Sequence, residues 1–390
     1  DRAATAIAAP REHPGDSFVL HAPLETLARI GLLDHVADRD RRPVLERIGS
    51  VADQYGTYEA WTGDATGPSE FGDVDAARTT LVQSIAASDF DGVDAAVAWL
   101  ATRLDTDELV RAVADPVIPS LAAAAHGSIF LYLLPRVAAR NLPAAAMLRT
   151  TAHELARRPD WRLTFVDELP SSTTMPSDAA ATELERRLMR PTHVTPGSSV
   201  NCPMRDAVER AGLATELTHD LAGTLTVRDA RHALLRTSAR SMLQDDRDHA
   251  PYGWSHALTM PQATLGIAAA SERPDLAIAI AATYVLGFRS THGSVAIDPD
   301  WEPDAPADPT TGRVDLDADP VVAAAQAWHA RQADRPAIWR RLAAHAGAHE
   351  DAHLAKYTLA CLDATRGDPS HEHLYLAAAA SLYRWWATRP

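Results

Sequence analysis

Apolar residues recur every three or four positions along most of the chain, which is the spacing of one face of an α-helix. Leucines and alanines repeat in this way at 24–36, 75–87, 227–243 and 321–332. The strict alternation that is typical of a β-strand is nearly absent, and 161–166 is the only short segment that resembles one. The pattern therefore predicts an all-α fold.

Helix-ending signals and two long irregular segments divide this pattern. Asp73 precedes a periodic run, the pair Asp115-Pro116 is typical of a helix start, and Gly367 is typical of a helix end. Segments 170–203 and 290–320 are rich in Pro, Gly and Asp and are longer than ordinary turns. We expect one large multi-helix domain over 1–390, with two long loops that cap a pocket.

Two apolar stretches could be either transmembrane helices or buried helices of a protein core. Segment 117–134 carries no charge and approaches the length of a membrane span, but it contains a proline, a glycine and a histidine. Segment 276–288 is too short to cross a bilayer. We expect both to be central helices of a large protein core.

Composition and charge exclude several classes of partner. The net charge is -15, whereas binding to nucleic acid or an anionic membrane requires basic patches. The two cysteines, Cys202 and Cys361, lie far apart and indicate no disulfide framework, so a cytoplasmic location is expected. There is no G-x-G-x-x-G after a strand, which disfavours a bound flavin.

A single lysine, Lys356, stands among 37 basic residues, so the other 36 are arginines. The two residue types are nearly exchangeable on a surface. They differ where chemistry requires a neutral amine, because a guanidinium keeps its proton in proteins. Lys356 is therefore either a leftover surface residue or a chemically required one, and its neighbours must decide.

The stretch around this lysine, 348–362, has the Ala/Leu content of a helix. One face of that helix would carry His349, His353, Lys356 and Ala360. Such a face is either solvated and inert or part of a metal site, since imidazole is a common neutral ligand.

The same stretch contains HEDAH, an H-E-x-x-H pattern typical of zinc peptidases. In that hypothesis His349 and His353 bind zinc, Glu350 is the general base, and Glu372 is the third ligand. The pattern is short, the chain has 17 histidines, and the usual surroundings of the third ligand are missing. The hypothesis also gives Lys356 no role, so we keep it as an alternative, beside a non-catalytic helical binding protein.

Three further histidines occur in apolar or aromatic surroundings. They are His21 at the entrance to the first helix, His126 in the uncharged run, and His256 in PYGWSHALTM. A buried polar side chain without a partner is costly, so each requires one. Singly, each is typical of a hydrogen-bonded core histidine, and together they favour a shared site.

Four motifs in this order resemble those of the questin oxidase-like family. They cover most of the chain, between residues 18 and 362, and read DSFVLHAPLETLARIGL, PSLAAAAHGSIFLYLLPRV, GWSHALTMPQATL and AHLAKYTLACL. The resemblance implies a non-haem iron centre, as Fe(II), that uses O2 to open a ring of an aromatic polyketide such as an anthraquinone. The ligands that it implies are His21, His126, His256, His353 and Lys356, with His349 as an alternative.

The fifth of these ligands requires modification of the amine. A free ammonium binds no metal, whereas a lysine carbamate formed with CO2 is an anionic oxygen donor suited to iron. Arginine cannot form it. Tyr252, Trp254, Thr259 and Tyr357 flank the presumed ligands and are expected either to shape the pocket or to pack in the core.

Some residues depart from the family pattern. They are Leu20, Pro23 and Gly127, and they leave the substrate more open than the metal. The expected substrate is an apolar aromatic small molecule, while the need for NADPH, the mono- or dioxygenase outcome and the oligomeric state stay open.

Overall fold

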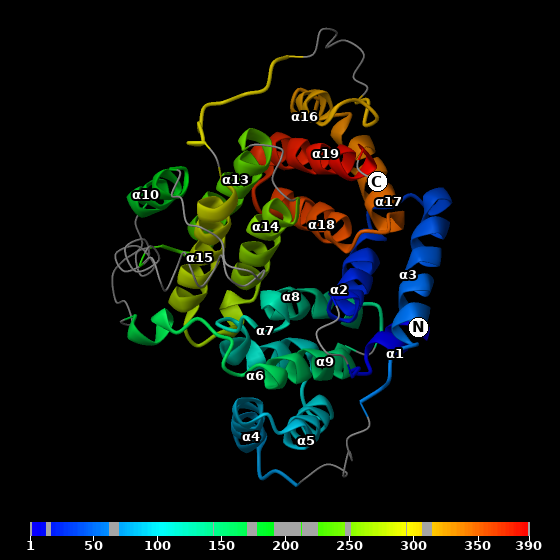
Figure 1. Cartoon of the computed structure of the whole chain (residues 1–390), viewed down its shortest axis with the longest axis vertical. Coiled ribbons are helices and arrows are strands. Elements are labelled where there is room, and N and C mark those ends of the chain that lie inside the picture. Colours follow the sequence, from blue (N-terminus) through cyan, green and yellow to red (C-terminus); the bar gives the residue numbers. More distant parts are fainter. Residues whose placement is uncertain are drawn as a thin grey trace.

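The computed structural model consists of helices joined by short turns and longer irregular segments (Figure 1). It describes residues 2–12, 17–61, 70–142, 144–169, 178–190, 212, 225–245, 251–293, 295–305 and 314–388. The helices are α1 (Arg2–Ile7), α2 (Ser17–Leu32), α3 (Arg41–Tyr55), α4 (Val74–Ala87), α5 (Phe90–Ala101), α6 (Thr106–Val117), α7 (Ala122–Ala125), α8 (Gly127–Ala138), α9 (Ala144–Arg157), α10 (Asp178–Leu188), α13 (Val227–Gln244), α14 (Pro251–Gly266), α15 (Pro274–His292), α16 (Pro320–Trp328), α17 (Arg335–Ala348), α18 (Ala352–Gly367) and α19 (Glu372–Thr388).

The predicted all-α class is confirmed. Within the described ranges there is no β-strand, and the suspected strand at 161–166 forms only an isolated bridge between Arg162 and Ser120. Two predicted signals also agree with the structure. The Asp73 carboxylate accepts the Ala76 N–H at 2.8 Å and caps α4, and α18 ends at Gly367. The single-domain boundary 1–390 stays a prediction.

Several expected helix boundaries are wrong. Asp115-Pro116 does not start a helix, because both residues lie inside the last turn of α6. The run 117–134 is not one helix, since the backbone turns at α7 before α8 begins. Likewise 348–362 is broken, because α17 ends at Ala348 and α18 starts only at Ala352. His21 lies within α2 and not at its entrance.

The helix expected at 276–288 lies inside α15, and its side chains are buried. Among the helices that the structure describes, none combines the length and apolar character required to cross a bilayer. Of the two long loops, 170–203 contains α10, which is followed by a turn at Met189 and Arg190, and residues 170–177 and 191–203 lie outside the described residues. In 290–320, α15 continues to His292 and the described remainder has irregular backbone until α16.

Four helices from distant parts of the chain meet at the centre of the molecule: α2, α8, α14 and α18. Each packs against two others, so that α18 contacts α2 and α14, and α8 contacts the same two (Figure 1). The remaining helices surround this group, with α4, α5, α6 and α9 on one side and α13, α16, α17 and α19 on the other. The main hydrophobic core runs through the four central helices, and a smaller one joins α10, α13 and α15.

Candidate metal centre

Each of the four central helices contributes one histidine to a cluster, in which His126 and His256 are buried and His21 and His353 are partly buried. His21 lies in α2, His126 is the N-cap residue of α8, His256 lies in α14, and His353 lies in the first turn of α18. The neighbouring rings lie with their centroids 4.9–5.1 Å apart in a closed circuit of four contacts. Residues more than 300 positions apart in the sequence therefore share one site.

Three of these histidines have the spacing of a ligand set. His21, His126 and His256 each bring one ring nitrogen within 4.8 Å of the others. The Nε2 atoms of His126 and His256 are only 3.1 Å apart. Two nitrogens bound to one metal ion at roughly 2.1 Å would be about 3–3.4 Å apart, so this spacing fits a shared ion. His353 adjoins the set through its ring contacts with His21 and His256.

A left-handed turn places His126. Ala123, Ala124 and Ala125 have φ values of 51°, 54° and 61°, which L-residues adopt at a cost of about 1–2 kcal/mol each. The turn brings the carbonyl of Ala123 to the His126 ring, where Nδ1 donates a hydrogen bond of 2.6 Å. This bond leaves Nε2 with its lone pair toward the cluster.

Two backbone hydrogen bonds to the segment after α9 hold that turn in place. The Leu121 N–H donates to the carbonyl of Trp161 at 2.6 Å, and the Leu163 N–H donates to the carbonyl of Pro119 at 2.9 Å. These bonds hold Pro119 and Leu121, which precede the turn, against Trp161 and Leu163. Such surrounding constraints are what lets a strained backbone persist at a functional site.

Lys356 lies one turn after His353 and reaches the same cluster. The side chain is buried, with 4% of its surface exposed, and its Nζ donates to His126 Nε2 at 3.2 Å. Burial lowers the pKa of this amine to about 7, although the carboxylates of Asp351 and Glu25 oppose the shift. Near neutral pH the amine can therefore be uncharged, which is the form that binds CO2 or a metal.

Two of the imidazoles, those of His126 and His353, are also held neutral. Burial, followed by the nearby Lys356 amine, lowers the pKa of His126 and of His353 well below the usual value. Asp351 orients the second of these rings, since its carboxylate accepts from His353 Nδ1 at 3.0 Å and from the His353 N–H at 2.7 Å. A carboxylate behind a histidine fixes the ring and raises its basicity as a ligand.

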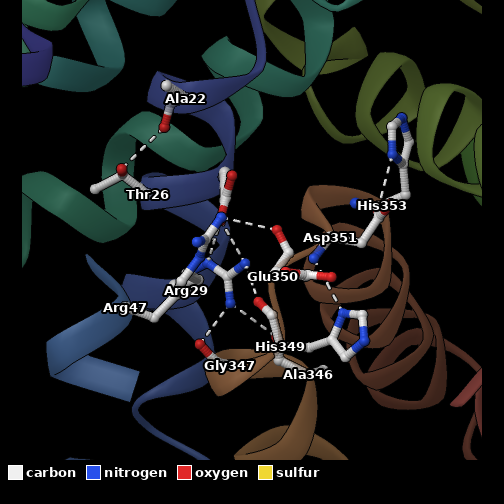
Figure 2. A network of polar contacts seen from close by, with 11 residues as sticks. Ala22, Thr26, Arg29, Arg47, Ala346, Gly347, His349, Glu350, Asp351 and His353 are labelled. Carbon is white, nitrogen blue, oxygen red and sulfur yellow. Dashed lines mark hydrogen bonds and ion pairs between the residues drawn. The ribbon is translucent and has the colours of Figure 1, made fainter. Parts of the chain in front are cut away.

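A second polar network holds the loop that carries Asp351 (Figure 2). Arg29 of α2 is fully buried and donates to the carbonyls of Ala346, Gly347 and His349 at the end of α17. The same guanidinium donates to the carboxylate of Glu25 at 2.5 and 2.9 Å. The network therefore fixes the α17–α18 junction to the helix that carries His21.

Two further residues support the site, Arg47 in the Arg29 network and Phe288 beside His256. Arg47 of α3 donates to the Glu25 carboxylate at 3.0 Å and to the carbonyl of Glu350 at 2.8 Å (Figure 2). On the other side of the cluster, the ring of Phe288 stacks on His256, with centroids 5.8 Å apart and planes at 17°. Both sides of the histidine circuit are thus supported by packed or hydrogen-bonded neighbours.

The structure does not assemble the zinc-peptidase arrangement. His349 lies between α17 and α18, where its Nδ1 accepts the Asp351 N–H at 3.0 Å, so it does not share a helix face with His353 (Figure 2). Glu350 is exposed. The carboxylate of Glu372 binds Arg335 and Trp339 at 3.3 and 3.2 Å. The expected use of His349 as an alternative ligand has the same geometric difficulty.

The other candidate residues have separate positions. Thr259 is buried one turn after His256, where its hydroxyl donates to the carbonyl of Ser255 at 2.9 Å. Tyr357 is buried next to Cys361 and Tyr375, and burial raises its pKa well above the usual value. The side chains of Tyr252 and Trp254 lie outside the described residues.

Some contributors were not anticipated from the sequence. Asp351 and Glu25 carry the carboxylates that raise the pKa of Lys356 against the effect of burial, and Arg29 joins their segments. The one available signal was the position of Asp351 two residues before His353, which is also a helix-capping position. Nothing in the sequence links Arg29 to a loop more than 300 residues away.

Comparison with known proteins gives no relative. No protein-family model matches the chain, no curated protein matches it, and no solved structure matches its fold. The resemblance to questin oxidase-like proteins therefore remains an interpretation of four motifs, and the function has to be argued from the site.

The donor set itself has a clear chemical preference. It offers imidazole nitrogens and one amine, and the neighbouring carboxylate of Asp351 is engaged with the His353 ring. Imidazoles suit zinc, copper, iron and nickel, while a cluster of several lone pairs without a cation is unfavourable. The residues therefore fit a divalent transition metal, and a carbamate on Lys356 would add the missing negative charge.

Proposed function

We propose that this protein is an oxygen-dependent, non-haem iron enzyme that opens a ring of an apolar aromatic substrate, such as an aromatic polyketide. The observation that carries the proposal is the meeting of four histidines, two buried and two partly buried, with the only lysine at the centre of four helices. A structural role alone would not explain why this one position retains lysine in a chain that otherwise uses arginine.

Five side chains would hold the iron. They are His21, His126, His256, His353 and Lys356. The neutral amine of Lys356 would add CO2 to form a carbamate and release one proton, which gives the site an anionic oxygen. Bound iron would supply the electron transfer that lets O2 react with an aromatic ring. Asp351 and the carbonyl of Ala123 keep two of the imidazoles in the ligating tautomer.

The protein part of the mechanism is orientation and exclusion of water. Burial lowers the pKa of His126, His353 and Lys356, which favours the uncharged forms that have lone pairs available. The ring of Phe288 and the apolar core surround the cluster. Transfer of an apolar substrate from water into such surroundings is favourable in free energy. The substrate class is thus proposed from the apolar surroundings and the motif resemblance.

An assay of oxygen uptake tests this function. Protein purified without a metal-binding tag is loaded with Fe(II), and oxygen consumption is followed with an anthraquinone-type hydroquinone or ketone, with and without NADPH. We expect consumption that requires both iron and the aromatic compound, with a ring-opened product by mass spectrometry. Lys356→Arg should abolish it. Oxygen uptake that is absent with a panel of such compounds, despite bound iron, would contradict the proposed substrate class.

The same preparation separates this proposal from its rivals. A zinc peptidase would lose activity in Glu350→Gln and tolerate Lys356→Arg, whereas we expect the opposite pattern. A non-catalytic binding protein would retain no tightly bound transition metal. The exposed position of Glu350 makes Glu350→Gln a suitable control, because that change leaves the buried cluster untouched.

A further inference from the structure

A pocket lies on the side of the molecule where α4, α6 and α9 pack against one another (Figure 1). Its volume is about 380 Å³. Pockets that take small organic molecules are typically about 300–1,000 Å³, so the space has the size for such a compound. We call it the α4 pocket, and its lining includes Val82, Ile85, Ala86, Asp115, Leu155 and Arg162.

Apolar side chains form most of the lining of the α4 pocket. Ile85 and Leu155 are buried, whereas Val82 stays 42% exposed although it is a large apolar residue, and Ala86 is exposed as well. The pocket thus reaches from the exposed face of α4 to buried side chains of α4 and α9. An apolar compound that leaves water for such walls gains free energy.

Three polar residues also line the pocket, namely Asp115, Ser120 and Arg162. Two of them have partners within the protein. The Asp115 carboxylate accepts from the Ser271 hydroxyl at 2.6 Å, and the Ser120 hydroxyl accepts from the Ala122 N–H at 3.1 Å. These contacts leave Arg162 as the polar group to consider for a ligand.

Arg162 has donors left over. A guanidinium carries five N–H groups, and among the described residues one acceptor is recorded for this side chain, the carboxylate of Asp167. The side chain of Arg162 is 41% exposed, so it is accessible from solvent. A carbonyl or hydroxyl oxygen of a ligand can therefore accept a hydrogen bond from it.

The charges at the pocket disfavour an ionic ligand. One carboxylate, Asp115, and one guanidinium, Arg162, line it, and the guanidinium is already paired with Asp167. An anion would find no net positive charge there, and a cation would be repelled by Arg162. The lining therefore favours an uncharged compound.

The α4 pocket is separate from the histidine cluster, since the two share no residue. Leu155 lines the pocket, and its Cδ1 lies 3.7 Å from the position that a Cβ on Gly127 would take. Gly127 follows His126 directly and begins α8. A ligand in the pocket would thus contact Leu155 and not the imidazoles.

From these observations we infer that the α4 pocket is a second ligand site of this protein. It binds an uncharged, mainly apolar small molecule between α4, α6 and α9, and Arg162 donates a hydrogen bond to an oxygen of that molecule. The site requires neither a metal ion nor oxygenase activity, so it stands or falls independently of the proposed function.

Prodan, an uncharged naphthalene ketone whose fluorescence depends on the polarity around it, is a suitable probe. We expect the full-length, metal-free protein to bind it saturably, with emission shifted to shorter wavelength. Ala86→Trp places a large ring at the pocket from an exposed position of α4, and should abolish this binding. Ala87→Trp, at the next exposed position and outside the lining, is the matched control and should bind like the wild type.

A second pair of variants tests the polar contact. Arg162→Met keeps an apolar stem but removes the donors, and should weaken Prodan binding by about tenfold. Arg158→Met changes a neighbouring exposed arginine outside the lining, and should have no effect. Anilinonaphthalene sulfonate, an anion of similar size, should fail to displace Prodan.

Each measurement has a result that would overturn its part of the inference. No saturable Prodan binding, or binding that Ala86→Trp leaves unchanged, would overturn the site. Equal affinities of Arg162→Met and the wild type would overturn the hydrogen bond, and displacement of Prodan by the anion would overturn the uncharged ligand class. Thermal unfolding verifies that each variant is folded.

Discussion

Two buried polar clusters lie side by side in this protein, and they solve the problem of burial in opposite ways. In the Arg29 network, a permanent charge is matched by Glu25 and by three backbone carbonyls (Figure 2). In the histidine cluster, the converging nitrogens of His21, His126 and His256 include no carboxylate among the described residues, and burial lowers the pKa of His126 and His353. The first cluster is complete as a structural element, whereas the proposed function requires a cation in the second.

This difference explains why one cluster uses arginine and the other lysine. A guanidinium is suited to a site that supplies a carboxylate and several carbonyls, because it always carries charge and has five donors. In the proposed function, the position beside His126 needs a group that can lose its proton. The contrast then assigns to the sole lysine the place where charge has to be switchable.

The largest expected effect comes from placing a permanent charge in the histidine cluster. Lys356→Arg should lose nearly all bound metal, because a guanidinium beside His126 repels a cation and cannot form a carbamate. Metal content by inductively coupled plasma mass spectrometry checks this, and circular dichroism verifies the fold. Wild-type metal content in Lys356→Arg would contradict the claim that the histidine cluster requires an amine that can lose its proton.

Removing the charge balance of the other cluster should act mainly on stability. Glu25→Gln leaves Arg29 buried without its carboxylate, which costs about 3–5 kcal/mol of unfolding free energy. Guanidinium denaturation measures the change. As a control, Glu46→Gln removes the partner of Arg42 on the surface of α3 and should have no measurable effect. Equal effects of the two substitutions would contradict the importance of the buried pair.

Acid should destabilise the metal-free protein through the histidine cluster. The pKa values of His126 and His353 are lowered in the folded state, so below their ordinary pKa of 6.5 only the unfolded chain takes up the protons. The unfolding free energy should therefore fall as pH drops below that value, by up to about 2.7 kcal/mol per pH unit for two histidines.

Lys356 adds a second window to this pH dependence. Its pKa is about 7 in the folded protein and 10.5 ordinarily, so stability should rise with pH between these values. Denaturation midpoints of chelator-treated protein across both windows provide the measurement. A flat profile would mean that the cluster is not held neutral. Saturation with metal should raise the unfolding free energy without flattening the acid side, because bound ligands take up no protons while the unfolded chain still does.

A weaker effect is expected from the residue that joins the two clusters. Asp351→Asn preserves the cap of α18 but removes the negative charge behind His353, and should reduce metal affinity by roughly 10–100-fold. Competition with a chelator of known affinity measures this. Glu350→Gln next to it is the matched control and should leave affinity unchanged. An unaltered affinity in Asp351→Asn would show that His353 is not a ligand.

The smallest effect concerns the left-handed turn before His126. Ala124→Gly removes a steric cost at φ 54° but makes the unfolded chain more flexible, so the unfolding free energy should change by less than about 1 kcal/mol. Metal affinity should stay the same. Denaturation and chelator competition check both, and a large destabilisation would contradict the left-handed backbone at this position.

The sequence was informative about features that depend on neighbouring residues, such as helical spacing, helix ends and short motifs. The helical spacing predicted the all-α class, and Asp73 and Gly367 marked a helix start and a helix end. The histidines of the four motifs do meet, although their role as ligands stays a prediction. Their meeting could be expected only because four motifs were considered together, since each histidine alone is typical of a packed core.

Other features depend on contacts that local patterns do not contain. The helix expected at 348–362 breaks because the last carbonyls of α17 bind Arg29, a residue of α2. The run 117–134 reads as one apolar helix, yet its alanines tolerate a left-handed turn that backbone bridging to 161–163 imposes. The small pocket beside Lys356 is likewise invisible in sequence, since the alanines that line it, Ala28, Ala263 and Ala360, resemble any others in an Ala-rich chain.

The most direct test of the central claim is the metal content of protein purified without a metal-binding tag and reconstituted anaerobically with Fe(II). The account predicts about one iron per chain that survives gel filtration, is lost in Lys356→Arg, and persists in Glu350→Gln. A chain that retains no transition metal under these conditions would contradict it, because the buried histidines and Lys356 would then have only a structural role.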